Sequence, residues 1–149
     1  MNIKTLIVAL IFVSPKAFAG AWGVGSFEND SALDWVYEIE ESEGSGVLLQ
    51  TLRDVFLSDY IEADVCSSAI AASEVVAAIK SGKYNSLPES LASWSKANQG
   101  IYEPEMSKFA QKALELCLDK TKSELAQLWE ESDLSEWKAS VKELELKLE

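Results

Sequence analysis

Residues 61–81 read IEADVCSSAIAASEVVAAIKS, a stretch with helical spacing of apolar residues and no strand-like alternation. One helical face is apolar throughout, with Val65, Ala69, Ala72, Val76 and Ile79. The opposite face is small or apolar as well, with Ala63, Ser67, Ile70, Ala77 and Ala78. Because a helix that is apolar on nearly every side is buried by its neighbours, this stretch predicts the central helix of an all-α protein.

Other segments with helical spacing surround this stretch on both sides. They predict five more helices, at residues 31–41, 47–58, 86–98, 104–130 and 134–148. The links between them are short, which favours antiparallel packing of neighbouring helices. The predicted fold is a single compact all-α bundle of about six helices, with an irregular segment containing glycine and tryptophan at its N-terminal side.

Capping residues mark several of these helix ends. Asn29, Asp30 and Ser31 each offer a side-chain oxygen to the start of the first helix, and Ser31 begins an S-x-x-D capping-box pattern. Gly82 is placed to end the central helix. Pro104 is placed to begin the helix predicted at 104–130, whose apolar stripe includes Thr121.

Residues 1–19 have the pattern of a secretory signal peptide. Lys4 precedes the apolar run LIVALIFV, and Ala17-Phe18-Ala19 matches the small-residue pattern before a cleavage site. The run is shorter than the roughly 20 apolar residues of a membrane-spanning helix. We therefore expect cleavage, no membrane insertion of the mature chain, a domain at residues 20–149, and a periplasmic or secreted location.

The chain is strongly acidic, with a formal net charge of −12. Residues 20–79 contain twelve acids against a single base, Arg53, whereas residues 80–149 contain thirteen acids and ten lysines. A negative field of this kind repels nucleic acid and anionic lipid headgroups and attracts cationic proteins. The composition excludes a nucleic-acid-binding function and indicates a basic protein or peptide as partner.

The two cysteines, Cys66 and Cys117, each lie within an apolar helical pattern. An even number of cysteines in an oxidising compartment favours a disulfide, here between two packed helices. The alternative is a pair of separate buried thiols.

Three stretches together resemble a known family: GAWGVGSFENDSALDW (20–35), SAIAASEVVAAIKSG (68–82) and SELAQLWEE (123–131). In this order and approximate spacing they are similar to the DUF4259 family of small bacterial domains of unknown function. The first stretch is the most specific, and its matching residues are Gly20, Trp22, Gly23, Gly25, Phe27, Asn29, Asp30, Ala32 and Asp34. The resemblance supports a single domain and implies no activity, substrate or cofactor.

This first stretch has two interpretations. In the structural one, Trp22 and Phe27 anchor the segment in the core while Gly23 and Gly25 allow tight turns. In the other, the glycine-rich entry to a helix N-terminus holds an anion. The acids around it, Glu28 among them, would repel phosphate, which favours the structural interpretation.

Three carboxylates recur on one face of the first predicted helix, at Asp34, Glu38 and Glu41. Like charges at this spacing, near the helix C-terminus, act against helix stability. A binding role explains such a stripe: docking of a basic partner or weak binding of a divalent cation. The alternative is a solvated face that keeps the protein soluble. No D-x-D-x-D-G loop is present, so no metal site is predicted.

Glu74 is the one charged residue between Asp64 and Lys80, within the predicted central helix. A buried carboxylic acid can serve in proton transfer. With Glu62 or Asp64 it would make a carboxylate couple like that of glycosidases. In the structural alternative, Glu74 accepts a hydrogen bond from an indole N–H or pairs with Arg53.

The chain contains no histidine, which excludes Ser-His-Asp and Cys-His catalysis and histidine-bound zinc. No cofactor is predicted. The first hypothesis is a secreted non-enzymatic domain that binds another protein through its acidic face, as an inhibitor, immunity-type or assembly factor. The alternatives are a carboxylate-dependent hydrolase built around Glu74 and a structural protein without a specific ligand.

Overall fold

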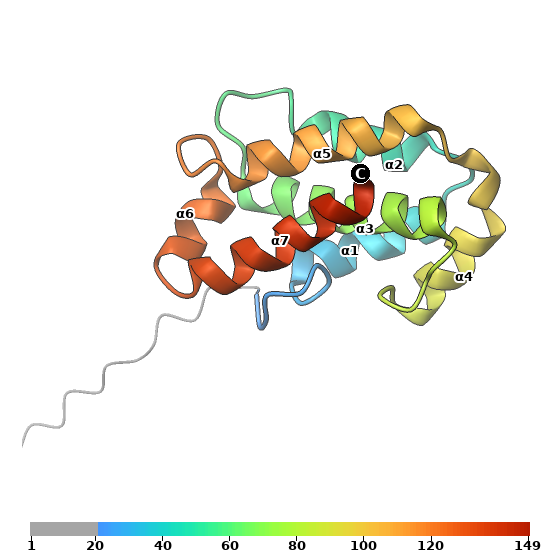
Figure 1. Ribbon diagram of the computed structural model, residues 1–149, viewed down its shortest axis with the longest axis horizontal. Helices are drawn as coiled ribbons and strands as arrows, with labels where there is room; N and C mark the ends of the chain where they lie inside the picture. The colour runs from blue at the N-terminus through green and yellow to red at the C-terminus, as the bar shows by residue number, and fades with distance from the viewer. Residues whose placement is uncertain (1–20) are drawn as a thin grey trace, which may run out of the picture.

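Helix α3 (Ala63–Ser81) runs through the middle of the computed structural model, which describes residues 21–149 (Figure 1). It contacts each of the six other α-helices in that part of the chain. The predicted signal peptide, residues 1–19, lies outside the described residues. The elements around α3 are α1 (Asp30–Glu40), α2 (Gly46–Asp54), α4 (Glu89–Ala97), the 3-10 helix η1 (Gln99–Ile101), α5 (Pro104–Leu118), α6 (Glu124–Glu130) and α7 (Leu134–Leu148).

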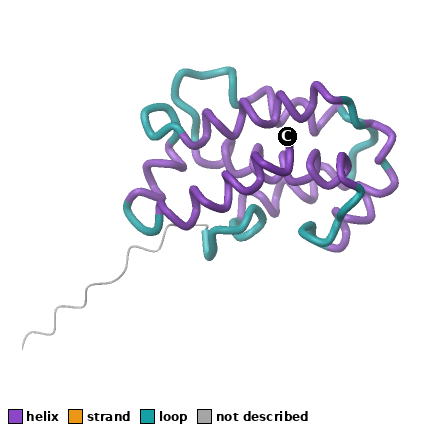
Figure 2. The backbone as a smooth tube through the Cα atoms, in the orientation of Figure 1, coloured by secondary structure: helices purple, strands orange, loops and turns teal. Residues whose placement is uncertain are grey.

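The all-α prediction is confirmed, since residues 21–149 contain helices and loops but no strand (Figure 2). Helices α5 and α7 pack along α3 and against each other, while α1 and α2 cover it from other sides. Helices α4 and α6 lie at opposite ends of the bundle (Figure 1). None of the helices in residues 21–149 has the length and apolar character needed to cross a bilayer.

The burial of α3 follows from its composition. Every residue from Ala69 to Ile79 is buried, and the many alanines allow neighbouring helices to approach closely. The helix ends at Gly82, whose φ of 68° lies in the left-handed region that favours glycine. Around it, large side chains such as Leu52, Leu114 and Leu144 are almost completely buried, each contributing about 1.5–3 kcal/mol.

Cys66 of α3 and Cys117 of α5 form a disulfide, with a Cα–Cα distance of 5.5 Å. Both residues are fully buried in the core. The bond links two helices through cysteines that are 51 residues apart in sequence. Of the two possibilities left open by the sequence, the structure has the disulfide.

The prediction of one long helix at 104–130 is wrong, because the chain turns between α5 and α6. The Asp119 carboxylate accepts hydrogen bonds from the N–H and the hydroxyl of Thr121, which closes a turn. Ser123 then caps α6 by accepting a hydrogen bond from the N–H of Ala126. Thr121 is therefore exposed and does not continue the apolar stripe.

The same corner explains why α3 begins at Ala63 and not at the predicted residue 61. The Ile61 N–H donates to the Lys122 carbonyl at 2.8 Å, and the Ile61 carbonyl accepts from the Glu124 N–H at 3.0 Å. The Glu124 carboxylate also accepts the N–H of Ala63 at 2.8 Å. The backbone of Ile61 is thus paired with a distant segment, which prevents it from joining the helix.

Two further helix ends differ from the predictions. Of the three predicted caps of α1, Asn29 is confirmed, since it accepts the Ala32 N–H at 2.8 Å. The helix therefore begins at Asp30, Ser31 lies inside it, and the predicted Ser31 capping box does not form. Helix α2 ends at Asp54, four residues before the predicted end at Ser58. Beyond it, Phe56 is 42% exposed and stacks on Phe109, with ring centroids 4.9 Å apart.

The hydrogen bonds of the turn at Asp119 affect the pKa of the Asp119 carboxyl. Hydrogen bonds from the side chain and then the backbone of Thr121 lower the pKa of Asp119 below its ordinary value of 3.8. A carboxyl with a lowered pKa adds stability above its unfolded-state pKa, and this contribution is lost as the pH falls through the folded-state value. We expect Thr121→Ala to raise the Asp119 pKa toward 3.8, measured by carboxyl NMR titration. An unchanged titration curve would contradict this role of Thr121.

Candidate functional site

A pocket of about 310 Å³ lies between α1, α2 and α3, and carboxylates are its main polar feature. Glu38 comes from α1, Asp54 from the last position of α2, and Asp64 from the first turn of α3. No lysine or arginine occurs among the described residues that line it. We call it the acidic pocket, defined by these three acids.

The apolar wall of the acidic pocket is held by hydrogen bonds. The indole N–H of Trp35 donates to the Thr51 hydroxyl at 2.7 Å, and that hydroxyl donates to the Val47 carbonyl at 2.9 Å. Trp35 is itself 4% exposed. Because Trp35 is almost completely buried, it fixes the wall from behind, and the partly exposed Val47 and Val65 supply apolar surface that can cover the stem of an organic cation while the acids pair with its charge.

The predicted stripe of Asp34, Glu38 and Glu41 is exposed on the outer side of α1. Only Glu38 of the three also lines the acidic pocket. Between them, Tyr37 is 69% exposed, although tyrosine is a large and partly apolar side chain. These four residues form a surface that we call the acidic face.

The acids of residues 28–64 have no lysine or arginine ion-pair partner within residues 21–149. The ion pairs there are Lys120–Glu130, Lys142–Glu145, Lys147–Glu74 and Lys147–Glu143. None includes an acid from residues 28–64. The lysines of the second half therefore do not neutralise the acidic face or the acidic pocket by direct pairing. Within the same residues, no group of three or more His, Cys, Asp or Glu side chains is arranged to hold a metal ion.

Sequence reasoning missed Asp54, Asp64 and Tyr37 as members of this site. Asp54 and Asp64 lie on different helices, and only the packing of α2 beside α3 brings them to the same pocket. Tyr37 had a usable signal, since it lies three residues after Asp34 and four before Glu41 and so shares their helical face.

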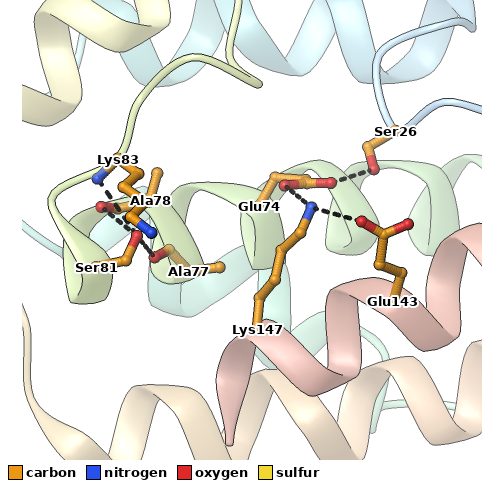
Figure 3. Close-up of polar contacts among 8 residues, drawn as sticks. All are labelled: Ser26, Glu74, Ala77, Ala78, Ser81, Lys83, Glu143 and Lys147. Atoms are coloured by element: carbon orange, nitrogen blue, oxygen red, sulfur yellow. Dashed lines mark hydrogen bonds and ion pairs between the residues drawn. The ribbon is translucent and has the colours of Figure 1, made fainter.

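Glu74 is buried on α3 and 9% exposed. One carboxylate oxygen accepts a hydrogen bond from the Ser26 hydroxyl at 3.0 Å, and the other lies 4.0 Å from the Lys147 ammonium (Figure 3). These partners replace the indole or Arg53 that the sequence suggested. Asp64 lies ten residues away on the same helix, about 15 Å along its axis, so the two acids do not form a couple.

The irregular segment before α1 is fixed at several points. The backbone N–H of Trp22 donates to the Glu28 carbonyl at 3.0 Å, and Ala21 pairs with Asn29 in an isolated β-bridge. Phe27 packs against the core, as predicted. The prediction that Trp22 is a second buried anchor is wrong, because its side chain is 59% exposed.

The glycines of this segment surround a carboxylate of the chain itself. The Gly25 N–H donates to the Glu28 carboxylate at 2.8 Å. A Cβ at Gly25 would lie 2.7 Å from the same oxygen, and a Cβ at Gly23 would also collide with that carboxylate. The anion in this turn is therefore Glu28, which leaves no room for the external anion considered as the alternative.

The segment of residues 20–140 matches a family model described as a domain of unknown function, DUF4259. The chain belongs to this family. The match includes the glycine and tryptophan motif, helices α1 to α6 and the first seven residues of α7. No protein with a curated description and no solved structure shows significant similarity to the chain.

The contact between Gly25 and Glu28 gives the family motif a testable structural role. We expect Gly25→Ala to lower the free energy of unfolding by about 1 kcal/mol, because the new methyl group displaces the Glu28 carboxylate from its hydrogen bond. Urea unfolding of Gly25→Ala, of Glu28→Ala and of the double variant Gly25→Ala/Glu28→Ala measures the coupling energy between the two residues. If the two substitutions are additive, Glu28 is not the reason for the glycine.

Proposed function

We propose that this chain is an exported, non-enzymatic domain that binds a basic segment of another protein through the acidic face and the acidic pocket. The observation that carries the proposal is the acidic pocket, where helices α1, α2 and α3 each supply a carboxylate and the described lining includes no basic residue. Three acids that have no ion-pair partner among residues 21–149 attract a cation and give it several acceptors.

The shape of the site supports a lysine or arginine side chain as the bound group. Such a side chain has an apolar stem and a charged end, and it can lay the stem on an apolar wall. Val47 and Val65 provide that wall, while Glu38 and Asp54 accept hydrogen bonds from the charged end. The exposed Tyr37 beside Glu38 offers aromatic area of the kind that is enriched at the centres of interfaces.

An exported location fits this proposal. The signal-like residues 1–19 and the disulfide both suit an oxidising compartment. In the periplasm or outside the cell, a domain of this kind can act as an inhibitor, an immunity-type factor or an assembly factor for its basic partner.

The hydrolase alternative has weaker support. Glu74 lines a separate pocket of about 460 Å³, and it is the one carboxylate among the described residues that line that pocket. Glycoside hydrolysis of the usual kind needs a second carboxylate on the other side of the reacting bond. Glu143 faces Glu74 across the Lys147 ammonium, but it does not line the pocket, and the lysine lies between the two acids where a substrate would have to lie.

A pull-down from periplasmic extract tests the proposed function. The tagged domain is compared with the variant Asp34→Ser/Glu38→Ser/Glu41→Ser at low and at high salt. A control variant, Glu105→Ser/Glu115→Ser/Glu136→Ser, makes the same change of charge at exposed positions of the second half. We expect the first variant and high salt each to abolish capture of a basic protein, because exposed charges are screened by salt, and the control to retain it. Retention of every captured partner by the first variant would contradict the proposal.

A further inference from the structure

A second pocket, of about 460 Å³, differs from the acidic pocket in its charge. It lies at the C-terminal half of α3, beside the loop that follows α3 and the end of α7. Its described lining contains two lysines, Lys83 and Lys147, and one acid, Glu74. It shares no lining residue with the acidic pocket. We call it the lysine pocket.

The Lys147 ammonium is held near two carboxylates but donates a hydrogen bond to neither of them. The side chain extends from α7 toward α3, and its nitrogen lies between the carboxylates of Glu74 and Glu143 (Figure 3). The two distances are 4.0 Å and 3.9 Å, which is too long for a hydrogen bond. Both acids attract the ammonium electrostatically, while its three N–H donors remain available for another acceptor.

Glu74 is itself held in place on the other side. The Ser26 hydroxyl of the N-terminal segment donates to one of its oxygens at 3.0 Å, which leaves the second oxygen directed at Lys147.

Lys142, on the same helix as Lys147, differs because its ammonium does donate a hydrogen bond to an acid. Its ammonium lies 2.6 Å from the Glu145 carboxylate and is engaged in a direct charge-assisted hydrogen bond.

The other walls of the lysine pocket are of two kinds. Ala77 and Ala78 supply an apolar surface along α3, and their small side chains leave the volume open. Asn85 and Ser86 of the following loop add hydrogen-bonding groups near Lys83 in the sequence. A volume of about 460 Å³ is within the range of roughly 300–1,000 Å³ found for small-molecule sites.

We propose that the lysine pocket binds a small organic carboxylate with an apolar body. The carboxylate accepts hydrogen bonds from the Lys147 ammonium, and the apolar body lies on Ala77 and Ala78. Lys83 and Lys147 balance Glu74 of the lining and Glu143 beside it, so the charges at this pocket cancel, in contrast to the strongly acidic protein as a whole. A cation would have to compete with Lys147 for Glu74, whereas an anion uses donors that are available.

Calorimetric titration with octanoate tests this proposal, with octan-1-ol and octylamine as probes of the same chain length. We expect octanoate to bind and Lys147→Gln to weaken its binding about tenfold, the size of one charge-assisted hydrogen bond. Lys142→Gln removes a lysine from the same helix and should leave the octanoate Kd unchanged. Equal binding of the three probes, or an unchanged Kd for Lys147→Gln, would overturn the proposal.

An NMR titration locates the bound octanoate in the wild-type chain. The proposal expects the largest amide shifts at Ala77, Ala78 and Ser86. Shifts centred on the exposed Phe56 and Leu57 would instead identify nonspecific apolar binding and overturn it. Octanoate binding can be tested separately from the proposed function. Glu38→Gln/Asp54→Asn changes the acidic pocket alone and should leave octanoate binding unchanged.

Discussion

Reduction of the Cys66–Cys117 disulfide is expected to lower the free energy of unfolding by about 4 kcal/mol, since the cross-link closes a loop of 51 residues in the unfolded chain. For a domain of this size, that change corresponds to a decrease in Tm of roughly 10–20 °C. Few single changes in the molecule should have a larger effect on stability. The bond ties the central helix α3 to α5, which is also its main packing partner.

Urea unfolding of the oxidised and the reduced wild-type protein measures this effect without any substitution. The variant Cys66→Ala/Cys117→Ala provides a second measurement, in both redox conditions. It should be less stable than the oxidised protein and insensitive to reductant. If oxidised and reduced wild-type protein unfold at the same urea concentration, the disulfide contributes nothing to stability.

The second large effect is expected at the acidic pocket, where stability and binding should change in opposite directions. Glu38 and Asp54 lie near the C-terminal ends of α1 and α2, where a negative charge opposes the helix dipole. Glu38→Gln/Asp54→Asn should therefore raise the free energy of unfolding, by about 0.5–1 kcal/mol. The same variant should bind an arginine-rich peptide at least about tenfold more weakly, because two charge-assisted contacts are lost.

A matched control is available in the second half of the chain. Glu115→Gln/Glu131→Gln removes two exposed acids and changes the net charge by the same amount. It should leave peptide affinity within about twofold of the wild-type value, since charges beyond a Debye length of about 10 Å are screened. If Glu38→Gln/Asp54→Asn loses both stability and binding, the two acids are structural and the binding account is wrong.

Most of the fold could be predicted from local pattern. The central position of α3 followed from a helix without a polar face, and the predicted bounds of α7, at residues 134–148, agree with the structure. The break between α5 and α6 was missed because apolar residues continue at helical spacing on both sides of it, at Cys117 and Leu125. The turn depends on Asp119 and on the pairing of Ile61 with this corner, which periodicity does not reveal.

The candidate site was only partly predictable. Spacing along one helix was enough to place Asp34, Glu38 and Glu41 on a common face. The acidic pocket needs two further helices, whose positions are set by the packing of α1, α2 and α3 against one another. Trp22 shows the opposite error: an aromatic residue between glycines suggested a buried anchor, whereas the hydrogen bonds of its backbone hold the segment and leave the side chain exposed.

The most direct test of the account is an NMR titration of the wild-type chain with a short arginine-rich peptide, at about 20 mM and about 500 mM salt, which span weak and strong screening. We predict that the largest shifts at low salt include the Trp35 indole N–H and the amides of Glu38, Asp54 and Asp64, and that they disappear at high salt. Shifts of similar size over both halves of the molecule, or shifts that persist at high salt away from α1 and α2, would contradict the proposed acidic binding site.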